Sequence, residues 1–481
     1  NVYNLSNYRT YPTVYNNYDL HNKSNSLYGF VNLGYKGMVY LDLTARNDWT
    51  STLKYKENDS YFYPSASLSV LLNKMLGMNG SIDLLKLKAN YAEVGNDIER
   101  FQLDPFISFN RGSNGEAGFK EETVKNLNNL KPEFTKSWEL GAQAILFNNR
   151  LNVDFTYYSS KTTNQIWKMD VSSISGYNQI IRNIGEVKSS GLEITLSATP
   201  VKTGKFQWNT NVNWSMDRTE VTELDNEAPE YGISKSIAYG LYAYDFVGER
   251  RGAIYSRVAR KFKYDPEVHD ASLEQYNGKL FFDGSKDLPR SDEEIIGYHN
   301  PDWVGSWFNE FRYGNLSVSA LLFANVGNSV YNGFEKSFVG DGLDKRTVAG
   351  REDGVLPDGV WESPEGIRPF LPGDEVDAES YWGDFMTDGE INDIWISDGS
   401  FLKLKEVKLA YDLPSKFFVK GPFRAVKVSL IGRNLALWTD VKHVDPETYS
   451  DTDNAGKIPG LAKAGGVPSA RSYTLNLRLR F

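Results

Sequence analysis

The feature that most constrains this chain is a strict alternation of apolar and polar residues with a period of two. Residues 206–216 read FQWNTNVNWSM. One set of alternate positions holds Phe206, Trp208, Thr210, Val212, Trp214 and Met216, and the other holds Gln207, Asn209, Asn211, Asn213 and Ser215. This period is typical of a β-strand whose two faces meet different environments. The amides must face water or a polar network, whereas the aromatic rings need an apolar partner layer or lipid.

The alternation recurs in runs of about ten residues, the length that a tilted transmembrane β-strand needs. Examples lie at 39–46, 138–146, 151–158 and 192–199. By this length criterion we count about thirteen strands, which predicts an all-β, antiparallel transmembrane barrel. The apolar face changes around residues 405–407 and again around Asn434. Either a β-bulge or the exit of the strand from the lipid band would cause such a change.

The connections between the expected strands alternate between short and long. Short links lie at 36–37, 147–150, 200–205 and 313–315, and long ones at 95–131, 166–182, 225–301, 327–397 and 439–470. A soluble sandwich has no reason to place every long connection at one end. Outer-membrane barrels have short periplasmic turns and long external loops. The sequence therefore predicts long extracellular loops.

Composition excludes several other classes of protein. The 481 residues contain no run of about eighteen apolar residues, so no transmembrane helix is expected. The absence of cysteine excludes thiol catalysis, disulfides and thiolate metal sites, and the net charge of -9 argues against nucleic-acid binding. No signal peptide is recognisable at residue 1. If the C-terminus is periplasmic, an odd number of strands places the start of the first strand, near Ser26, outside the cell. Because single-chain bacterial barrels close with an even number of strands, the odd count also predicts that the barrel continues upstream.

One segment carries a resemblance to a known family. Residues 398–414, DGSFLKLKEVKLAYDLP, resemble a late-barrel strand of SusC/RagA-type TonB-dependent outer-membrane transporters. The matching positions are Ser400, Phe401, Leu402, Leu404, Lys405, Val407, Leu409, Tyr411 and Pro414. Lys403 and Glu406 replace the commoner Arg and Asn. Segments at 61–72, 85–96, 132–143, 190–200 and 432–438 follow in the family's order, so the resemblance covers nearly the whole chain.

The resemblance implies a location and a set of partners. Residues 26–481 would form the C-terminal part of a barrel of about twenty-two strands with a plugged lumen, and residues 1–25 an extracellular loop or strand end. The plug domain itself is not recognisable in this sequence. The family resides in the outer membrane, draws energy from TonB, works with a SusD-like surface lipoprotein as a lid, and imports oligosaccharides, glycans or peptides. Its members often pair through their barrels, so a dimer is possible.

The last strand ends in an alternating apolar series of five residues: Tyr473, Leu475, Leu477, Leu479 and Phe481. Within the resemblance, this series is similar to the C-terminal signal that barrel-assembly machinery reads. The alternative is a simple edge strand in a soluble sheet.

The sequence offers no recognisable catalytic, cofactor or metal site. The four histidines, His21, His269, His299 and His443, are scattered in loop-like segments, and GxSxG and phosphate-cradling motifs are absent. The acidic stretches 281–294 and 340–354 do not fit the EF-hand spacing. We therefore expect no enzyme, no resident cofactor and no metal.

Aromatic residues in the long 327–397 segment are the candidate contacts to substrate or lid: Trp361, Tyr381, Trp382 and Trp395. Aromatic faces stack on sugars or on apolar peptide side chains, but the same rings can pack the loop against itself or against the lid, and we favour packing.

Two other functions stay open at this point. A passive porin or adhesin-like barrel would lack a plug and a TonB segment. A soluble all-β protein that acts on glycans would need two carboxylates across a cleft, and it would not depend on detergent.

Overall fold

The computed structural model describes most of the chain. The described residues are 21–53, 59–78, 80–98, 107–111, 117–121, 124–125, 130–224, 230–232, 240–387, 391–417, 421–447, 461–462 and 469–481. The expected extracellular segment 1–25 therefore lies largely outside them.

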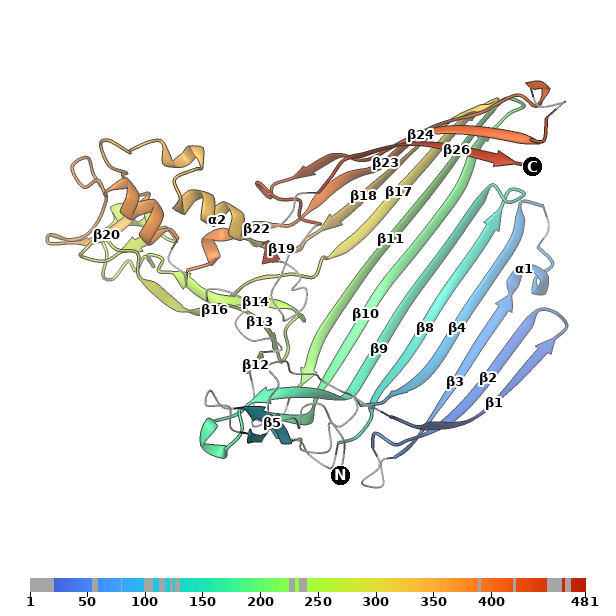
Figure 1. Cartoon of the computed structure of the whole chain (residues 1–481), viewed down its shortest axis with the longest axis horizontal. Coiled ribbons are helices and arrows are strands. Elements are labelled where there is room, and N and C mark those ends of the chain that lie inside the picture. The colour runs from blue at the N-terminus through green and yellow to red at the C-terminus, as the bar shows by residue number, and fades with distance from the viewer. Residues whose placement is uncertain are drawn as a thin grey trace.

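A single twisted antiparallel sheet of long strands dominates the structure (Figure 1). Thirteen strands follow one another in its hydrogen-bonded order: β1 (Ser24–Tyr35), β2 (Val39–Thr50), β3 (Ser60–Leu71), β4 (Ile82–Asn96), β8 (Glu133–Leu146), β9 (Leu151–Asp170), β10 (Gln179–Lys202), β11 (Phe206–Glu223), β17 (Trp303–Tyr313), β18 (Leu316–Val326), β23 (Phe401–Asp412), β24 (Ala425–Thr439) and β26 (Ser472–Arg480). The predicted antiparallel architecture and the strand count are confirmed. The sheet is open, with β1 and β26 as its edges among the described strands.

Strand register places the alternating residues on two separate faces. Asn213 lies opposite Thr195 and Ser306, whereas Trp214 lies opposite Ile194 and Gly305. We call the side that carries Asn209, Asn211 and Asn213 the polar face, and the side that carries Trp208, Val212 and Trp214 the apolar face. Because neighbouring strands keep the same register parity, each face continues from strand to strand.

Tight turns and long connections lie at opposite ends of the strands (Figure 1). The turn between β1 and β2 has positive φ at Lys36 and Gly37, the backbone of a short hairpin turn. The bounds predicted for the long connection at 166–182 were wrong, because β9 runs to Asp170 and β10 begins at Gln179. These two strands extend well beyond the expected ten-residue span.

A β-bulge explains the change of face in β23 and β24. The pairing shifts between Leu404 and Glu406, so that Lys405 faces two residues of β24, and Asn434 takes a left-handed φ of 54°. The β-bulge, one of the two causes that the sequence left open, is therefore present.

The segments that follow β11 and β18, joined by β25 (Leu461–Ala462) from the segment after β24, fold into an outer loop domain beyond one end of the sheet (Figure 1). Its strands form three small sheets. The first contains β12 (Glu230–Gly232), β13 (Leu241–Phe246), β14 (Ala253–Ala259) and β16 (Arg290–Tyr298), and the second contains β15 (Leu280–Phe282), β20 (Gly359–Ser363) and β21 (Gly366–Pro369). The third contains β22 (Ile396–Asp398), β19 (Ser329–Asn332) and β25. Its helical elements are α2 (Gly333–Gly340), η3 (Ala271–Tyr276), η4 (Lys345–Thr347), η5 (Ser380–Phe385) and η6 (Asp393–Trp395).

The remaining elements are short. They are β5 (Ile107–Arg111), β6 (Ala117–Glu121), β7 (Val124–Lys125), α1 (Leu72–Met75), η2 (Ser173–Ser175) and η7 (Ser415–Phe417). β5 pairs with β6, and β7 pairs in parallel with β10. Among the described residues, no helix has both the length and the apolar character needed to cross a bilayer.

The outer loop domain has its own hydrophobic cores and is fastened to the ends of the long strands. One core gathers Phe282, Trp361 and Ile391, and another gathers Leu241, Val339 and Trp395. The segment before β14 docks on the end of β11, where the Arg251 N–H donates to the carbonyl of Thr219 at 2.8 Å. Arg250 then reaches the start of β17, where its guanidinium contacts the Asp302 carboxylate at 2.6 Å.

Two glycines let side chains bridge across a strand on the polar face. Lys88 of β4 pairs with Asp154 of β9 at 2.9 Å, across Gly141 of β8. The Tyr158 hydroxyl of β9 donates to Asp217 of β11 at 2.7 Å, across Gly191 of β10. A Cβ on Gly191 would overlap the Tyr158 ring and would lie 2.5 Å from the Met216 carbonyl oxygen. Glycine is therefore required at 191 for this bridge and for the approach of β11.

We expect Gly191→Ala to destabilise the folded sheet by roughly 1–3 kcal/mol, because the backbone carbonyl of Met216 cannot move aside as a side chain could. The control is Gly29→Ala in β1, where no atom lies within 4 Å of the added Cβ. The measurement is the urea midpoint of the folded band on unheated SDS gels. Equal midpoints for the two variants would contradict this account of Gly191.

Candidate functional site

The polar face carries a network of side-chain hydrogen bonds. Asn211 donates to Ser197 at 2.6 Å, Asn213 to Asn211 at 2.8 Å, and Asn209 to Glu310 at 3.1 Å. The alternating amides thus have the polar partners that the sequence predicted for them. Such a face suits a wet interior, because each polar group is solvated or hydrogen-bonded.

The apolar face carries exposed rings whose polar atoms are satisfied within the sheet. The Trp307 indole N–H donates to the Thr210 hydroxyl at 2.9 Å, and the Trp208 N–H donates to the Asn309 side chain at 3.1 Å. The Trp208 ring also stacks on Phe311 with centroids 5.7 Å apart. Thr210, the one polar residue in the apolar series of β11, is therefore a partner for an indole that lies in an apolar environment.

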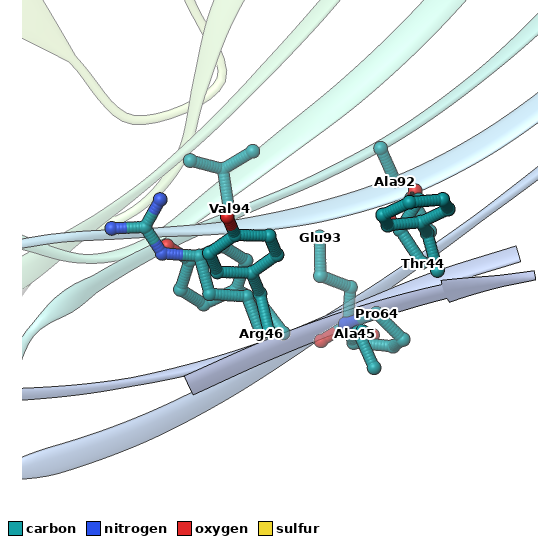
Figure 2. Close-up of a pocket in the computed structure, with 12 residues that line it drawn as sticks. Thr44, Ala45, Arg46, Pro64, Ala92, Glu93 and Val94 are labelled. Carbon is teal, nitrogen blue, oxygen red and sulfur yellow. Dashed lines mark hydrogen bonds between the residues drawn. The ribbon is translucent and has the colours of Figure 1, made fainter. Parts of the chain in front are cut away.

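A hollow of about 410 Å³ lies on the first four strands near the β1 edge of the sheet (Figure 2). Tyr28, Phe30 and Tyr63 line it together with Arg46. Arg46 is paired with Asp48 at 2.7 Å, and the Tyr63 hydroxyl donates to the same carboxylate at 2.7 Å. These bonds hold the charged group of Arg46 against its own strand.

The C-terminal strand has the predicted alternation. Leu475, Leu477 and Leu479 lie opposite Leu430, Val428 and Val426 of β24, on the apolar face, and Tyr473 belongs to the same series. The strand ends at Arg480, one residue before the expected end, and the Phe481 ring contacts Phe423 with centroids 5.1 Å apart. A role of this series as an assembly signal remains a prediction.

The bulge in β23 anchors the last long loop to the sheet. It sets Lys403 and Lys405 so that both reach that loop. Lys403 contacts Asp445 at 2.5 Å and Glu447 at 2.8 Å, and Lys405 also pairs with Glu447. Lys403 is only 2% exposed, so its charge depends on these carboxylates. Sequence reasoning found the bulge but not its partners, which lie about forty residues away in an irregular segment.

The same loop is also tied to the outer loop domain. Lys442 contacts Glu335 of α2 at 3.1 Å, and Arg346 pairs with the same carboxylate. His443 lies 3.5 Å from Asp344, which also accepts a bond from the Arg346 backbone N–H. That backbone hydrogen bond and the Arg346 guanidinium lower the pKa of Asp344 to about 2, although burial opposes them. The segment 442–447 thus connects the sheet wall to α2 through ion pairs.

The four aromatic candidates lie mainly inside the outer loop domain. Trp361, Tyr381 and Trp395 are buried in its cores, and the Trp395 N–H donates to the Met386 carbonyl at 2.8 Å. Trp382 is half-buried, meets Tyr381 edge-on and packs against two cores. These positions favour the packing interpretation, and direct contact of the four residues with substrate stays a prediction.

The three histidines other than His443 lie in separate places. His21 is an exposed residue before β1, His269 packs on the Phe262 ring, and His299 is partly buried against Gly252. Within the described part of the chain, no group of three or more His, Asp or Glu side chains is placed to hold a metal ion.

The pKa of Asp344 predicts how acid affects η4, whose Arg346 contacts this carboxylate through its backbone N–H and its guanidinium. A lowered pKa in the folded state contributes stability above the ordinary value of 3.8, and that stability is lost as the pH falls through about 2. A spin label at the exposed position 348, at the end of η4, should therefore gain mobility as the pH falls over this range. Asp344→Asn should make the label mobile already at a pH above this range. A label at Val268, elsewhere in the outer loop domain, controls for general unfolding. If Asp344→Asn left the pH dependence of the label's mobility unchanged, the change could not be assigned to the titration of Asp344.

Comparison with known proteins places these features in a family. The family model described as "TonB dependent receptor-like, beta-barrel" matches residues 1–350. The chain is 26% identical over 485 residues to TonB-dependent receptor P3 of Formosa agariphila, which covers 95% of this chain and 45% of that protein. It is 24% identical over 481 residues to TonB-dependent receptor SusC of Bacteroides thetaiotaomicron, covering 95% and 43%. The chain thus spans about half the length of the curated relatives it matches.

A solved structure shares the fold. The structure of the RagAB peptide transporter superposes with a TM-score of 0.71 at 21% identity, covering 95% of this chain and 48% of that one. The resemblance to SusC/RagA-type receptors is therefore confirmed at the level of family and fold. In an outer-membrane barrel, the polar face of such a sheet is the one expected to line the lumen, and the apolar face the one expected to meet lipid. The chain belongs to the TonB-dependent receptor β-barrel family, whose members are outer-membrane receptors and not enzymes.

Proposed function

We propose that this chain forms wall and outer loops of an importer that takes up oligosaccharides or peptides across the outer membrane with energy from TonB. The observation that carries the proposal is the combination of a continuous polar face over thirteen strands with a packed loop domain at one end. In this role the residues described above guide and enclose the substrate, and they carry out no chemical step.

A SusD-like lipoprotein lid over the outer loop domain is part of the same proposal. Support comes from the similarity to the solved structure of the RagAB peptide transporter and to the relative named SusC. The outer loop domain offers a rigid support for a lid, since it has several hydrophobic cores. It is attached to the sheet by Arg250 and, through the loop that follows β24, by Lys403.

The ion pairs at the loop that follows β24 suggest how an outer change could reach the wall. Segment 442–447 contacts both α2 and β23. A movement of the outer loop domain would therefore be transmitted directly to the ion pairs of Lys403 and Lys405. A contiguous set of contacts of this kind is one physical route by which a lid and a lumen can be coupled.

The proposal predicts that uptake depends on both the receptor and TonB. A strain that lacks this receptor should lose growth on one class of glycan or peptide supplied as sole nutrient, and a strain that lacks TonB should lose the same growth. Growth on the constituent monosaccharides or amino acids should be unaffected in both strains and serves as the control. Uptake that needs the receptor but continues without TonB would contradict energised import and indicate a passive porin.

A further inference from the structure

The hollow on the first four strands lies on the polar face of the large sheet. Its floor is one cross-strand row with a residue from each of these strands: Phe30, Thr44, Ser65 and Ala92. Strand register, followed from Asn213 through β10, β9, β8 and β4, assigns this row to the polar face. The hollow therefore opens toward the side that the proposed function gives to the lumen.

Side-chain size explains why the sheet is hollow at this point. Three of the four side chains in the row are small, whereas the neighbouring row contains the rings of Tyr28 and Tyr63. The side chains of Tyr28, Phe30 and Val94 are 70%, 69% and 53% exposed. Small side chains beside large ones leave a space of about 410 Å³. Ligand pockets occupy roughly 300–1,000 Å³.

The polar groups of the lining are already paired with one another or with the sheet. The hydroxyls of Thr44 and Ser65 share a hydrogen bond. The Tyr63 hydroxyl donates to Asp48, and the same carboxylate pairs with Arg46. Figure 2 shows the Arg46 guanidinium at one end of the hollow, away from Thr44. A ligand would therefore meet mainly aromatic and aliphatic surface.

The one acidic residue of the lining belongs to the other face. Glu93 pairs through its carboxylate with Lys136 at 3.1 Å and accepts a hydrogen bond from the Tyr91 hydroxyl. Lys136 lies opposite Glu93 in the register, and Tyr91 is two residues away on the same strand, so all three have the parity of the apolar face. A charged group of a ligand would lose its hydration in the hollow and gain no unpaired partner.

The hollow lies in the half of these strands that is nearer the long connections. Tyr28 is closer to Ser24, where β1 begins, than to Tyr35, where β1 ends beside the tight turn at Lys36 and Gly37. Under the proposed function, substrate reaches the lumen from the end of the long connections. The hollow is therefore in a position to contact substrate as it enters.

We propose that this hollow binds a large apolar side chain, aromatic or branched aliphatic, of a peptide in the lumen. Burial of such a group against rings and small side chains is favourable without specific hydrogen bonds. A sugar fits less well, because recognition of its hydroxyl groups needs free donors and acceptors, and those of this lining are engaged. This inference deepens the proposed import function and rests on it, since it selects apolar peptides from the two substrate classes.

The test is isothermal titration calorimetry on the receptor purified in detergent from the organism that makes it. The probes are neutral seven-residue peptides of glycine and serine whose central residue is phenylalanine, leucine, serine or glutamate, and a malto-oligosaccharide of similar length. Blank titrations into the detergent buffer correct for partition into micelles. We expect the phenylalanine peptide to bind about tenfold or more tightly than the serine peptide and the sugar, because a large apolar side chain is buried. Its affinity should change little with salt, since no ion pair forms.

Variants then locate the binding. Phe30→Ala should raise the Kd of the phenylalanine peptide about tenfold and leave that of the serine peptide unchanged. Ala92→Phe, which fills the hollow, should have the same effect. The control is Leu27→Ala, on the same strand but on the opposite face, because Leu27 is also 69% exposed. Phe30→Ala alone serves if Ala92→Phe does not fold, since it removes only an exposed ring.

Several results would overturn the inference. They are equal affinity for all the peptides (the result expected if another part of the receptor fills the hollow), equal effects of Phe30→Ala and Leu27→Ala, and tighter binding of the sugar or of the glutamate peptide. Calorimetry needs neither TonB nor the lid, so a negative result would leave TonB-dependent uptake intact. Conversely, uptake independent of TonB would refute the transport mechanism without affecting the binding measurement.

Discussion

The structure depends on the backbone hydrogen-bond ladder of the large sheet. Inside a bilayer there is no water to satisfy a free N–H or C=O group, so strands can cross only when each is paired on both sides. From β2 to β24, every strand of the large sheet has two such neighbours. The side chains are then sorted by register alone, with rings toward lipid and amides toward the lumen. The cross-strand bridges, the bulge and the loop anchors are all built on this ladder.

The outer loop domain is stabilised mainly by buried hydrophobic cores and not by one long hydrogen-bond ladder. It lies beyond the sheet and is built like a small soluble protein, with buried Phe, Trp and Val side chains behind short strands. Ion pairs join it to the wall. Arg250 contacts Asp302 on one side, and Lys403 contacts Asp445 on another. The Lys403 pair is buried, so breaking it would leave a charge without compensation, and this contact holds the loop that follows β24 firmly to the wall.

Much of the wall could be predicted from the sequence, and most of the outer loop domain could not. Alternation is a local signal, so the strands, their faces and the bulge near Lys405 were all readable. The outer ends of β9 and β10 were missed, because register irregularities near Gly185 interrupt the alternation there. The Lys403–Asp445 pair joins a strand to an irregular segment, and no periodicity links them. The burial of Trp361 and Trp395 likewise depends on packing between segments that are distant in sequence.

The central claim is that one side of each long strand meets lipid and the other meets a wet lumen. The absence of cysteine from these 481 residues helps the measurement, because each introduced thiol is then the only one in this part of the protein. Single cysteines at successive positions from 207 to 214 in β11 can be treated in intact outer membranes with a small, charged, water-soluble thiol reagent. The account predicts labelling at 207, 209, 211 and 213 and protection at 208, 212 and 214. Uniform labelling along the strand, or labelling with the opposite parity, would contradict it.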